Sequence, residues 1–324
     1  MARQGDKIRV GIIRCDTHAY WYAPLFEEPD PEIYRRVHRG CHYYFYEPDD
    51  PNRLRLRTVP GLVIAKVYDE EDRAKAEGLS ESYRGRPKVC DSYEEVSDDV
   101  DLVYIADCNY EGKDHVRLAT PGLEKGVPHF VDKPFAFTLD DARGIVDLAR
   151  KHHTAVMCSS LLRQSPHLDR FRNRLRDVAP VESVVVPSLG PSLACVFHGL
   201  SIIQSIMGEG CEWVESMGPE PYGVIRLHYR RADAILFTTQ GHIPEGTVTA
   251  ANYSHCGYHA SAYGKGGSIH SPRIDDYQFP HAGVRIVRMA KTMVQTGRPP
   301  IPYGSMLELM ETIEAARMGH NRGE

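Results

Sequence analysis

The chain has 324 residues, of which 42% are hydrophobic and 26% charged, as in an ordinary globular protein long enough for two domains. Its net charge is −5, and no basic run is long enough to follow a phosphate backbone, so we expect no nucleic-acid partner. The first apolar run, residues 8–13, is broken by Arg14 and Asp16, which argues against a signal peptide or a membrane span. We therefore expect a cytoplasmic protein without a membrane partner.

The cysteines are scattered singly and form no CxxC pair, so a disulfide framework or a Cys-rich zinc site is not expected. We predict that most are reduced core residues. Their positions are 15, 41, 90, 108, 158, 195, 211 and 256.

The first part of the chain alternates short apolar runs with helix-like segments. This alternation indicates βαβ units and a parallel sheet. We predict a Rossmann domain over residues 1–135. The expected strands are 8–13, 62–68, 102–106 and 129–131, the expected helices are 70–79 and 115–125, and a helix capped by Thr138 and a strand at 154–158 follow.

From about residue 180 the apolar runs no longer alternate with long helices, which favours a largely antiparallel open sheet. The chain is therefore expected to be α/β overall, with an α+β domain over residues 136–324 for substrate binding and oligomerisation. The strand-like runs are 181–186, 222–229, 234–239 and 247–253, and a last amphipathic helix is expected at 305–318.

An aromatic-rich segment at about 20–60 separates the first two strands and is longer than a βαβ crossover needs. Its many Tyr, Trp and Phe residues argue against disorder. We predict an ordered insertion that forms either an extra wall or oligomer arm, or a lid over the active-site cleft.

Lys133 directly follows an apolar strand and precedes a proline. The residue before a proline is held extended, and the carboxyl edge of a parallel sheet is where ligands bind. A lysine there can stabilise or relay the proton of a substrate hydroxyl beside a nicotinamide. The alternative is a surface lysine at the end of a strand.

The stretch Asp101–Arg163 resembles the Gfo/Idh/MocA family of nicotinamide-dependent oxidoreductases, with Asp132-Lys133-Pro134 in place of the family's Glu-Lys-Pro. Later segments that fit the resemblance are FHGLSIIQSIMG at 197–208, the hairpin at 263–269 and the stretch 296–316. The resemblance implies that Lys133 is catalytic and that Asp132 lies at the cofactor.

The resemblance also implies that His198 is an acid/base group facing the substrate and that Arg163 contributes to the substrate site. Imidazole suits that role near neutral pH. The aspartate that the family places four residues before this histidine is Ala194 here. The alternative is a capping or core histidine.

The family's glycine-rich turn is rewritten, because Arg14 and Asp16 stand where the first two glycines belong and only Ala19 is an accepted substitute. A side chain and a negative charge at Asp16 oppose the approach of a pyrophosphate. Asp16 or Thr17 can equally cap the following helix. The expected cofactor-binding residues are Gly11, Arg14, Asp16, Thr17, His18, Asp69, Asn109, Asp132 and Lys133.

Asp69 ends the second strand, where this fold binds the ribose of a dinucleotide. An acid at that place favours NAD over NADP, although an acid at the start of a solvated helix would look the same. Asn109 follows the third strand, where the family contacts its cofactor.

The second half is rich in histidines whose spacing matches no standard metal motif, so no metal is predicted. They are His255, His259, His270 and His281, with Cys256 nearby. A site that combines some of them with His198 is the alternative.

Together these observations predict an NAD-dependent enzyme that oxidises or reduces a secondary alcohol of a sugar, cyclitol or related polyol. We also expect a homodimer or homotetramer. Two alternatives are a redox- or metal-assisted lyase or glycoside-cleaving enzyme, and a non-catalytic homologue that binds a sugar or a partner.

Overall fold

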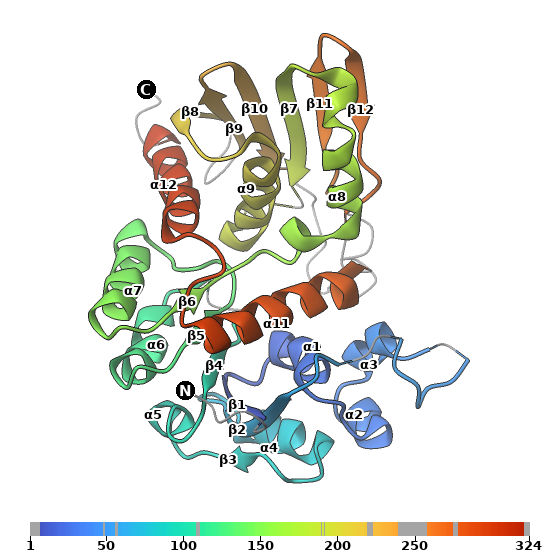
Figure 1. Ribbon diagram of the computed structural model, residues 1–324, viewed down its shortest axis with the longest axis vertical. Coiled ribbons are helices and arrows are strands. Elements are labelled where there is room, and N and C mark those ends of the chain that lie inside the picture. The colour runs from blue at the N-terminus through green and yellow to red at the C-terminus, as the bar shows by residue number, and fades with distance from the viewer. Residues whose placement is uncertain are drawn as a thin grey trace. The chain divides into compact units, whose positions relative to one another are not determined.

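The computed structural model describes residues 7–47, 49–55, 58–107, 111–188, 190, 192–218, 223–238, 258–274 and 278–320. The chain divides into two compact units (Figure 1). The first comprises Met1–Ser159 and Gly283–Tyr303, and the second comprises Ser160–Ala282 and Gly304–Glu324. Within the described residues, no helix is both long and apolar enough to cross a membrane.

A six-stranded parallel sheet forms the core of the first unit and confirms the predicted Rossmann-type sheet, with the order β3-β2-β1-β4-β5-β6. The strands are β1 Ile8–Ile13, β2 Leu62–Tyr68, β3 Lys88–Val89, β4 Leu102–Ile105, β5 His129–Val131 and β6 Val156–Met157. Ile13 pairs with Tyr68 on one side and with Ile105 on the other. The strand order therefore reverses at β1, and this reversal is where such sheets open a ligand-binding crevice.

Helices accompany these strands. They are α4 Arg73–Ser82, α5 Tyr93–Val96, α6 His115–Glu124 and α7 Leu139–Lys151, and most of α11 Phe279–Thr296 also belongs to this unit. Three of them, α4, α6 and α7, lie near the places that the sequence predicts, whereas α5 and α11 were not predicted. The Thr138 hydroxyl caps α7 by accepting the Asp141 N–H at 3.1 Å. This is the predicted N-cap, and it satisfies one of the unpaired amides of the first turn.

The boundary between the units lies later than the predicted residue 135. The reason is β6, where Val156 pairs with His129 of β5, so that α7 and β6 complete the parallel sheet before the chain leaves it. An apolar strand this short shows nothing in its sequence that assigns it to one sheet or the other.

The aromatic-rich insertion is ordered in the described residues and is mostly helical, with α1 Thr17–Phe26, α2 Pro31–Val37 and α3 Arg39–Phe45. Tyr22 and Phe26 are core residues, whereas Trp21 and Tyr44 are only partly buried. Tyr22 packs edge-on against Tyr104 and Phe130, with ring centroids 5.1 and 5.3 Å apart, and Phe26 is buried. These rings are therefore not available to stack on a sugar; Tyr43, which is 60% exposed, is an exception. Wall, oligomer arm and lid remain predictions for this segment.

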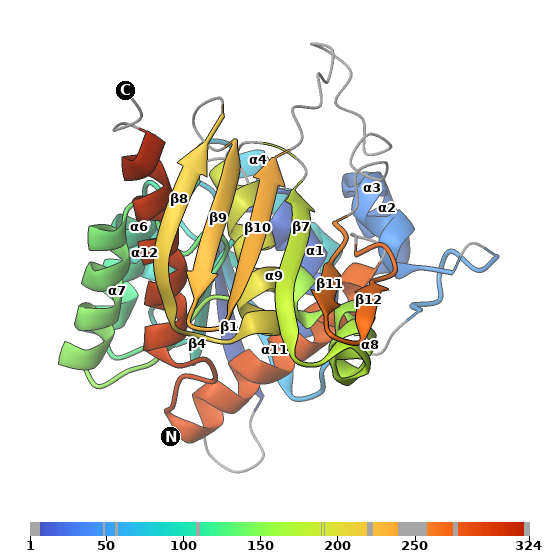
Figure 2. The ribbon, with the colours of Figure 1, turned by 90° about the horizontal axis from the view of Figure 1, so that it is seen from above.

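The second unit contains the predicted, largely antiparallel sheet in the order β12-β11-β7-β10-β9-β8, with one parallel pair between β10 and β7 (Figure 2). The strands are β7 Val181–Ser188, β8 Cys211–Met217, β9 Val224–Tyr229, β10 Ala232–Thr238, β11 Ser261–Gly264 and β12 Gly267–His270. The hairpin of β11 and β12 confirms the one predicted at 263–269. The predicted strand 247–253 lies outside the described residues.

The helices of the second unit are α8 Pro166–Asn173, α9 Leu193–Met207 and α12 Tyr303–His320, with 3₁₀ turns at η1 Leu162–Gln164 and η2 Leu175–Val178. α9 packs on β7 and β10 through its buried residues. α12 matches the predicted last helix, and Glu308 fixes it to the start of β8 by accepting the Gly210 N–H at 2.9 Å.

Six of the cysteines lie in the described part of the chain, and all six are free thiols, as predicted. Four of them are buried, namely Cys15, Cys41, Cys90 and Cys158.

Candidate active site

A buried charged residue follows each of four neighbouring strands. Arg14 follows β1, Asp69 follows β2, Asp107 lies two residues beyond β4, and Asp132 follows β5. Because all four strands are parallel, these side chains meet at the carboxyl edge of the sheet, where the candidate site lies. Asp107 was missed by the sequence analysis, although its position after a strand is the same signal that singled out Asp69.

The Asp16 carboxylate fixes the turn after β1. Arg14 takes a left-handed backbone conformation with φ of +67°, in which a side chain is uncommon. The Asp16 carboxylate then accepts the N–H groups of His18 at 2.8 Å and Ala19 at 3.3 Å, so Asp16 is the N-cap of α1. The capping role that the sequence left open for Asp16 is confirmed.

This cap decides how the turn meets a dinucleotide. In dinucleotide-binding folds the amides at the start of the first helix hold the pyrophosphate. Here the Asp16 carboxylate already accepts two of those N–H groups and adds a negative charge beside them. The turn therefore does not fit a pyrophosphate in the usual way.

Asp69 fits a ribose hydroxyl better. Its carboxylate accepts the backbone N–H groups of Cys15 at 2.7 Å, Glu71 at 3.1 Å and Asp72 at 2.9 Å. A carboxylate offers roughly four acceptor positions, so about one remains for a ligand hydroxyl. Asp69 thus has an acceptor position for a hydroxyl, whereas the amides at the start of α1 are already occupied.

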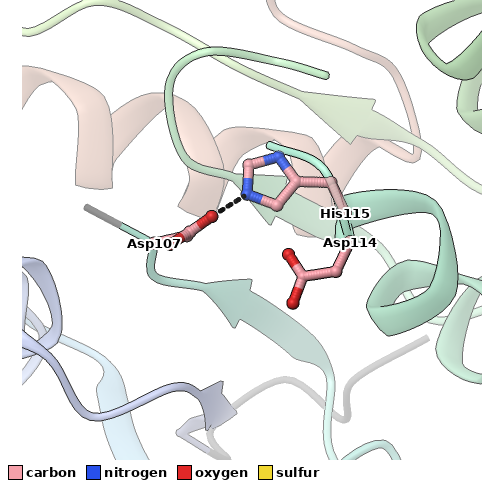
Figure 3. Close-up of side chains that lie close together, drawn as sticks. All are labelled: Asp107, Asp114 and His115. Atoms are coloured by element: carbon pink, nitrogen blue, oxygen red, sulfur yellow. Dashed lines mark ion pairs between the residues drawn. The ribbon is translucent and has the colours of Figure 1, made fainter. Parts of the chain in front are cut away.

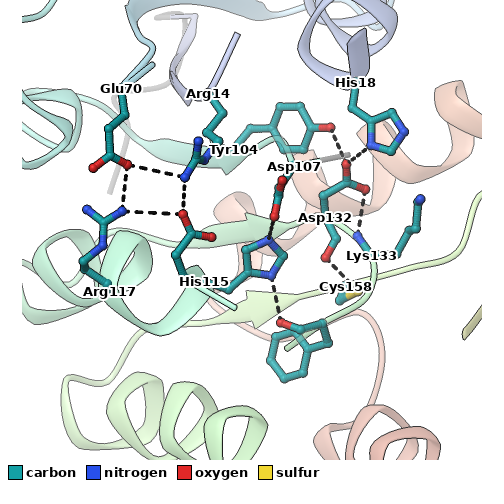
Figure 4. A network of polar contacts seen from close by, with 12 residues as sticks. Arg14, His18, Glu70, Tyr104, Asp107, His115, Arg117, Asp132, Lys133 and Cys158 are labelled. Carbon is teal, nitrogen blue, oxygen red and sulfur yellow. Dashed lines mark hydrogen bonds and ion pairs between the residues drawn. The ribbon is translucent and has the colours of Figure 1, made fainter. Parts of the chain in front are cut away.

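An ion-pair network joins the first turn to the start of α6, as Figure 4 shows. Arg14 contacts Asp114 and lies 3.4 Å from Glu70. Arg117 lies 2.7 Å from the same oxygen of Glu70. Burial lowers the pKa of Arg14, but the hydrogen bond and charge of Asp114 outweigh it, so the pKa is raised. The Arg14 charge is therefore compensated by residues of the chain itself.

Asp107, Asp114 and His115 place their ligand atoms within 4.8 Å of one another (Figure 3). The imidazole is held between two acceptors, since Nδ1 lies 3.1 Å from the Phe135 carbonyl and Nε2 lies 3.3 Å from Asp107. Burial lowers the pKa of His115, but Asp107 outweighs it, so the pKa is raised. Asp114 already contacts Arg14, and the imidazole already lies between Phe135 and Asp107, so the chain's own residues partner all three side chains of this group.

Lys133 and Asp132 lie at the end of β5, and Asp132 connects them to α1. One Asp132 oxygen accepts the Lys133 N–H at 2.8 Å, and the other contacts His18 Nδ1 and accepts the Tyr104 hydroxyl at 3.4 Å. In the part of the chain that the structure describes, Lys133 Nζ makes no ion pair. The sequence-predicted residues His18, Asp132 and Lys133 are thus brought together.

Of two other predicted cofactor residues, Gly11 has a packing role and Thr17 lines a cavity. A Cβ on Gly11 would lie 2.6 Å from a side-chain carbon of Val96, so glycine is needed there for α5 to approach β1. Thr17 lines a cavity of about 360 Å³ that neither Asp69 nor Lys133 lines. The cavity is bounded by Cys15, Asp16, Thr17, Tyr20, Val37, His38, Asp72, Ala74 and Lys75. Asn109 lies outside the described residues.

The predicted substrate residues of the second unit lie on or beside α9. His198 Nδ1 is 2.7 Å from the Ser160 hydroxyl oxygen, and Arg163 hydrogen-bonds to the Gln204 side chain. Burial lowers the pKa of Arg163. Of the histidine-rich group, His270 Nδ1 lies 2.9 Å from the Ser261 hydroxyl, while His255 and Cys256 fall outside the described residues. Metal binding by this group is untested.

Comparison with known proteins supports the resemblance drawn from the sequence. Residues 52–160 match the model of the Gfo/Idh/MocA family, described as an oxidoreductase family with an NAD-binding Rossmann fold. This match confirms the resemblance over the stretch that contains Asp69, Asp132 and Lys133. No curated protein matches the chain significantly.

Solved structures share the fold over nearly the whole chain. GenD2 from gentamicin A biosynthesis, solved in complex with NAD, is 14% identical with a TM-score of 0.72, and the match covers 100% of this chain and 97% of GenD2. Myo-inositol dehydrogenase from Lactobacillus casei, in complex with NAD(H) and myo-inositol, is 14% identical with a TM-score of 0.72, covering 98% and 96%. A myo-inositol dehydrogenase from Corynebacterium glutamicum is 13% identical with a TM-score of 0.70, covering 98% of each chain.

Proposed function

We propose that this protein is an NAD-dependent oxidoreductase that acts on a secondary alcohol of a sugar, cyclitol or related polyol. The observation that carries the proposal is the position of Lys133. It stands at the carboxyl edge of the parallel sheet, beside the buried carboxylate of Asp132, within the stretch that matches the oxidoreductase family. The names of the structural neighbours, which include inositol dehydrogenases, support the class of substrate.

Lys133 supplies positive charge where a substrate hydroxyl is expected to lose its proton. An ammonium has three N–H donors and no acceptor, so it can bind the substrate oxygen and stabilise it as negative charge develops. Asp132 accepts the Lys133 backbone N–H, which fixes the main chain at this point. Precise placement of this kind is a large part of what an enzyme contributes to such a reaction.

NAD, when bound, supplies the acceptor for the hydride that leaves the alcohol carbon. Asp69 has an acceptor position for a ribose hydroxyl, and its negative charge disfavours the additional phosphate of NADP. Lys133 would lie at the nicotinamide end. The N–H groups of His18 and Ala19 would not bind the pyrophosphate, because they donate to the Asp16 carboxylate.

Arg163 and His198 remain our candidates for substrate contacts in the second unit. Each already has a polar partner there, Gln204 for Arg163 and Ser160 for His198. A homodimer or homotetramer is also part of the proposal, and light scattering measures it directly.

Titration of the purified protein with NAD, NADH, NADP and NADPH, followed by intrinsic fluorescence and thermal shift, tests the cofactor assignment. We expect NAD and NADH to bind and to raise the melting temperature more than their 2′-phosphorylated forms. Turnover is then measured with NAD and a panel that includes myo-inositol and common sugars. Failure of all four dinucleotides to bind protein shown to be free of retained cofactor would overturn the proposal.

A second candidate function is favoured by the Asp16 cap. A homologue that has lost dinucleotide binding could bind a sugar or a partner without turnover, since the cap occupies the amides of His18 and Ala19. The same titration distinguishes the two, because this alternative predicts a thermal shift with a polyol and none with a dinucleotide.

A further inference from the structure

His18 and Asp132 form an imidazole–carboxylate pair at the carboxyl edge of the sheet. His18 Nδ1 contacts one oxygen of Asp132, and the side chain of His18 is 12% exposed while that of Asp132 is 3% exposed. Figure 4 shows the Lys133 side chain on the same side of Asp132 as the His18 ring. The pair thus adjoins the lysine on which the proposed function rests.

The charge on Asp132 decides which ring nitrogen carries the proton. Burial raises the pKa of Asp132, but the charge and hydrogen bond of His18 and the charge of Lys133 outweigh it, so the pKa is lowered. Both Asp132 oxygens already accept hydrogen bonds, from the Lys133 N–H and the Tyr104 hydroxyl, so Nδ1 faces an acceptor and donates to it. In the neutral ring this leaves the electron pair on Nε2, as in other pairs where a carboxylate orients a catalytic imidazole.

The backbone holds the ring in place independently of its partner. His18 lies in the first turn of α1, and its own N–H donates to Asp16 at 2.8 Å. The Tyr104 hydroxyl also donates to the Asp132 oxygen that faces the ring. The N-cap of α1 thus fixes the His18 backbone, and Tyr104 on β4 holds Asp132, which is the kind of support that an acid/base group requires.

We propose that His18 is the general base that takes the proton of the substrate hydroxyl, with Asp132 as the residue that positions it. This inference rests on the proposed function and deepens it. The substrate O–H bond breaks and an N–H bond forms at His18 Nε2. Bound NAD would supply the acceptor for the hydride that the alcohol carbon loses as the carbonyl forms, and it would be reduced to NADH. The imidazolium then returns its proton to solvent.

The need for such a base follows from Lys133. Its ammonium can stabilise an alkoxide but has no lone pair to accept the proton. The sequence resemblance places an acid/base histidine at His198 with an aspartate four residues earlier, yet that position is Ala194. A histidine–carboxylate pair is present in the first unit, between His18 and Asp132.

The tautomer of His18 is tested first, by NMR of protein labelled with ¹⁵N-histidine. His18→Gln identifies the resonances by their loss. We expect a protonated Nδ1 and an unprotonated Nε2 in the neutral ring. In Asp132→Asn, the amide keeps an oxygen for the Lys133 N–H but presents NH₂ to Nδ1, so the opposite tautomer should appear. An Nε2–H tautomer in the wild type would overturn the assignment without any measurement of turnover.

Kinetics test the proton transfer itself. His18→Gln keeps a donor for Asp132 without a titratable base, so kcat, measured at saturating NAD, should fall by about 10²- to 10⁴-fold. The variant should also lose one limb of the wild-type pH–rate profile, because it lacks the base. The ring contacts Asp132, which in turn accepts from Tyr104 and from the Lys133 N–H, and Asp16 accepts the His18 backbone N–H.

Two further variants separate a catalytic role from a structural one. Free imidazole should restore part of the activity of His18→Ala, which a merely structural residue would not allow. The matched control is His153→Asn, a change at an exposed histidine that follows α7 and precedes β6, at the opposite edge of the sheet. It should leave kcat and the pH profile unchanged.

The two proposals fail in distinguishable ways. If the wild type does not turn over any alcohol with NAD, the proposed function is overturned and the role of His18 in it falls as well. If the wild type is active and His18→Gln retains its kcat and its pH profile, only the assignment of His18 is overturned.

Discussion

Asp69 accepts the backbone N–H of Cys15 at 2.7 Å, and this hydrogen bond ties the turn after β1 to the end of β2. The fold usually leaves both places to its dinucleotide. Here Asp69 accepts three backbone N–H groups, which occupy most of its acceptor positions. Asp16 accepts a backbone N–H at the start of α1 beside it. The turn is thus stabilised by side chains of the chain itself, and this arrangement leads to the first prediction.

Replacing Asp16 by alanine should weaken the fold but strengthen NAD binding. Loss of the N-cap costs about 1 kcal/mol of unfolding free energy. It also removes a negative charge and releases the amides of His18 and Ala19. Repulsion between unit charges about 4 Å apart is roughly 4 kcal/mol at an effective dielectric constant near 20, so a gain in affinity of tenfold or more is reasonable. Urea unfolding and fluorescence titration measure the two effects.

Asp30→Ala is the matched control for that experiment. Asp30 caps α2 in the same manner, accepting the N–H groups of Glu32 at 3.1 Å and Ile33 at 3.2 Å. Its loss should lower stability by a similar amount and leave the affinity for NAD unchanged. Equal affinities in the Asp16 and Asp30 variants would show that the cap does not oppose the cofactor.

Lys133→Met should abolish turnover and leave NAD binding nearly intact. The methionine side chain fills similar space but cannot stabilise a developing alkoxide. We expect kcat to fall by about 10²-fold or more, because removal of one such donor costs roughly this much in other enzymes. Steady-state kinetics on an active polyol measure the loss of turnover, and a fluorescence titration measures the affinity for NAD. Lys151→Met, on the exposed end of α7, is the control and should behave as the wild type.

His115 should stabilise the fold most at low pH. Burial lowers its pKa, but Asp107 outweighs this effect and the pKa is raised. The folded protein therefore retains a proton that the unfolded chain releases above about 6.5. The resulting stabilisation is fully present below that pH and is lost as pH rises through the raised pKa.

Urea unfolding of the wild type and of His115→Gln at several pH values between 6 and 9 measures this contribution. The gap in unfolding free energy between the two proteins should narrow as pH rises. A gap that is the same at every pH would mean that His115 is not protonated in the folded state.

His129 should have the opposite pH dependence. Burial lowers its pKa to about 4, and Nδ1 bonds to the Val127 carbonyl at 2.8 Å while the buried Nε2 has no hydrogen-bond partner among the described residues. Its neutral form is therefore favoured by folding. Stability should be lost as pH falls from about 6.5 toward 4, by up to roughly 3 kcal/mol at 1.36 kcal/mol per pKa unit.

His129→Asn tests this assignment, because asparagine can still donate to the Val127 carbonyl but cannot take up a proton. Urea unfolding between pH 4 and 7 should show a shallower acid loss in the variant than in the wild type. An identical slope in both proteins would assign the acid sensitivity to other groups.

Much of the fold could be predicted from short-range patterns. The apolar runs that became β1, β2, β4 and β5 are bounded by charged or turn residues, and each occupies almost the predicted range. The Thr138 and Asp16 caps were also readable, because an N-cap is a local interaction between a side chain and amides two or three residues away. The domain boundary was not readable, since it depends on which strand β6 pairs with.

The contacts of the candidate site were the hardest to foresee. His18 and Asp132 are 114 residues apart in the sequence, and Arg14 and Asp114 are 100 residues apart. The sequence analysis placed the first three of these residues with the cofactor and missed Asp114. The resemblance predicted that these residues lie near the cofactor but not which side chains pair. The family's glycine-rich turn has no side chains that could form these pairs.

By itself, the sequence determined that Lys133 ends a strand of a parallel sheet and that Asp16 stands where a glycine is usual. Only the tertiary structure decided which partners those residues have. Asp16 accepts an N–H group at the start of α1, and Asp132 contacts both the Lys133 N–H and the His18 ring. The physical reason is that patterns of apolar residues encode which edge of a sheet a residue reaches. The hydrogen bonds at that edge depend on the order and register of strands that are distant along the chain.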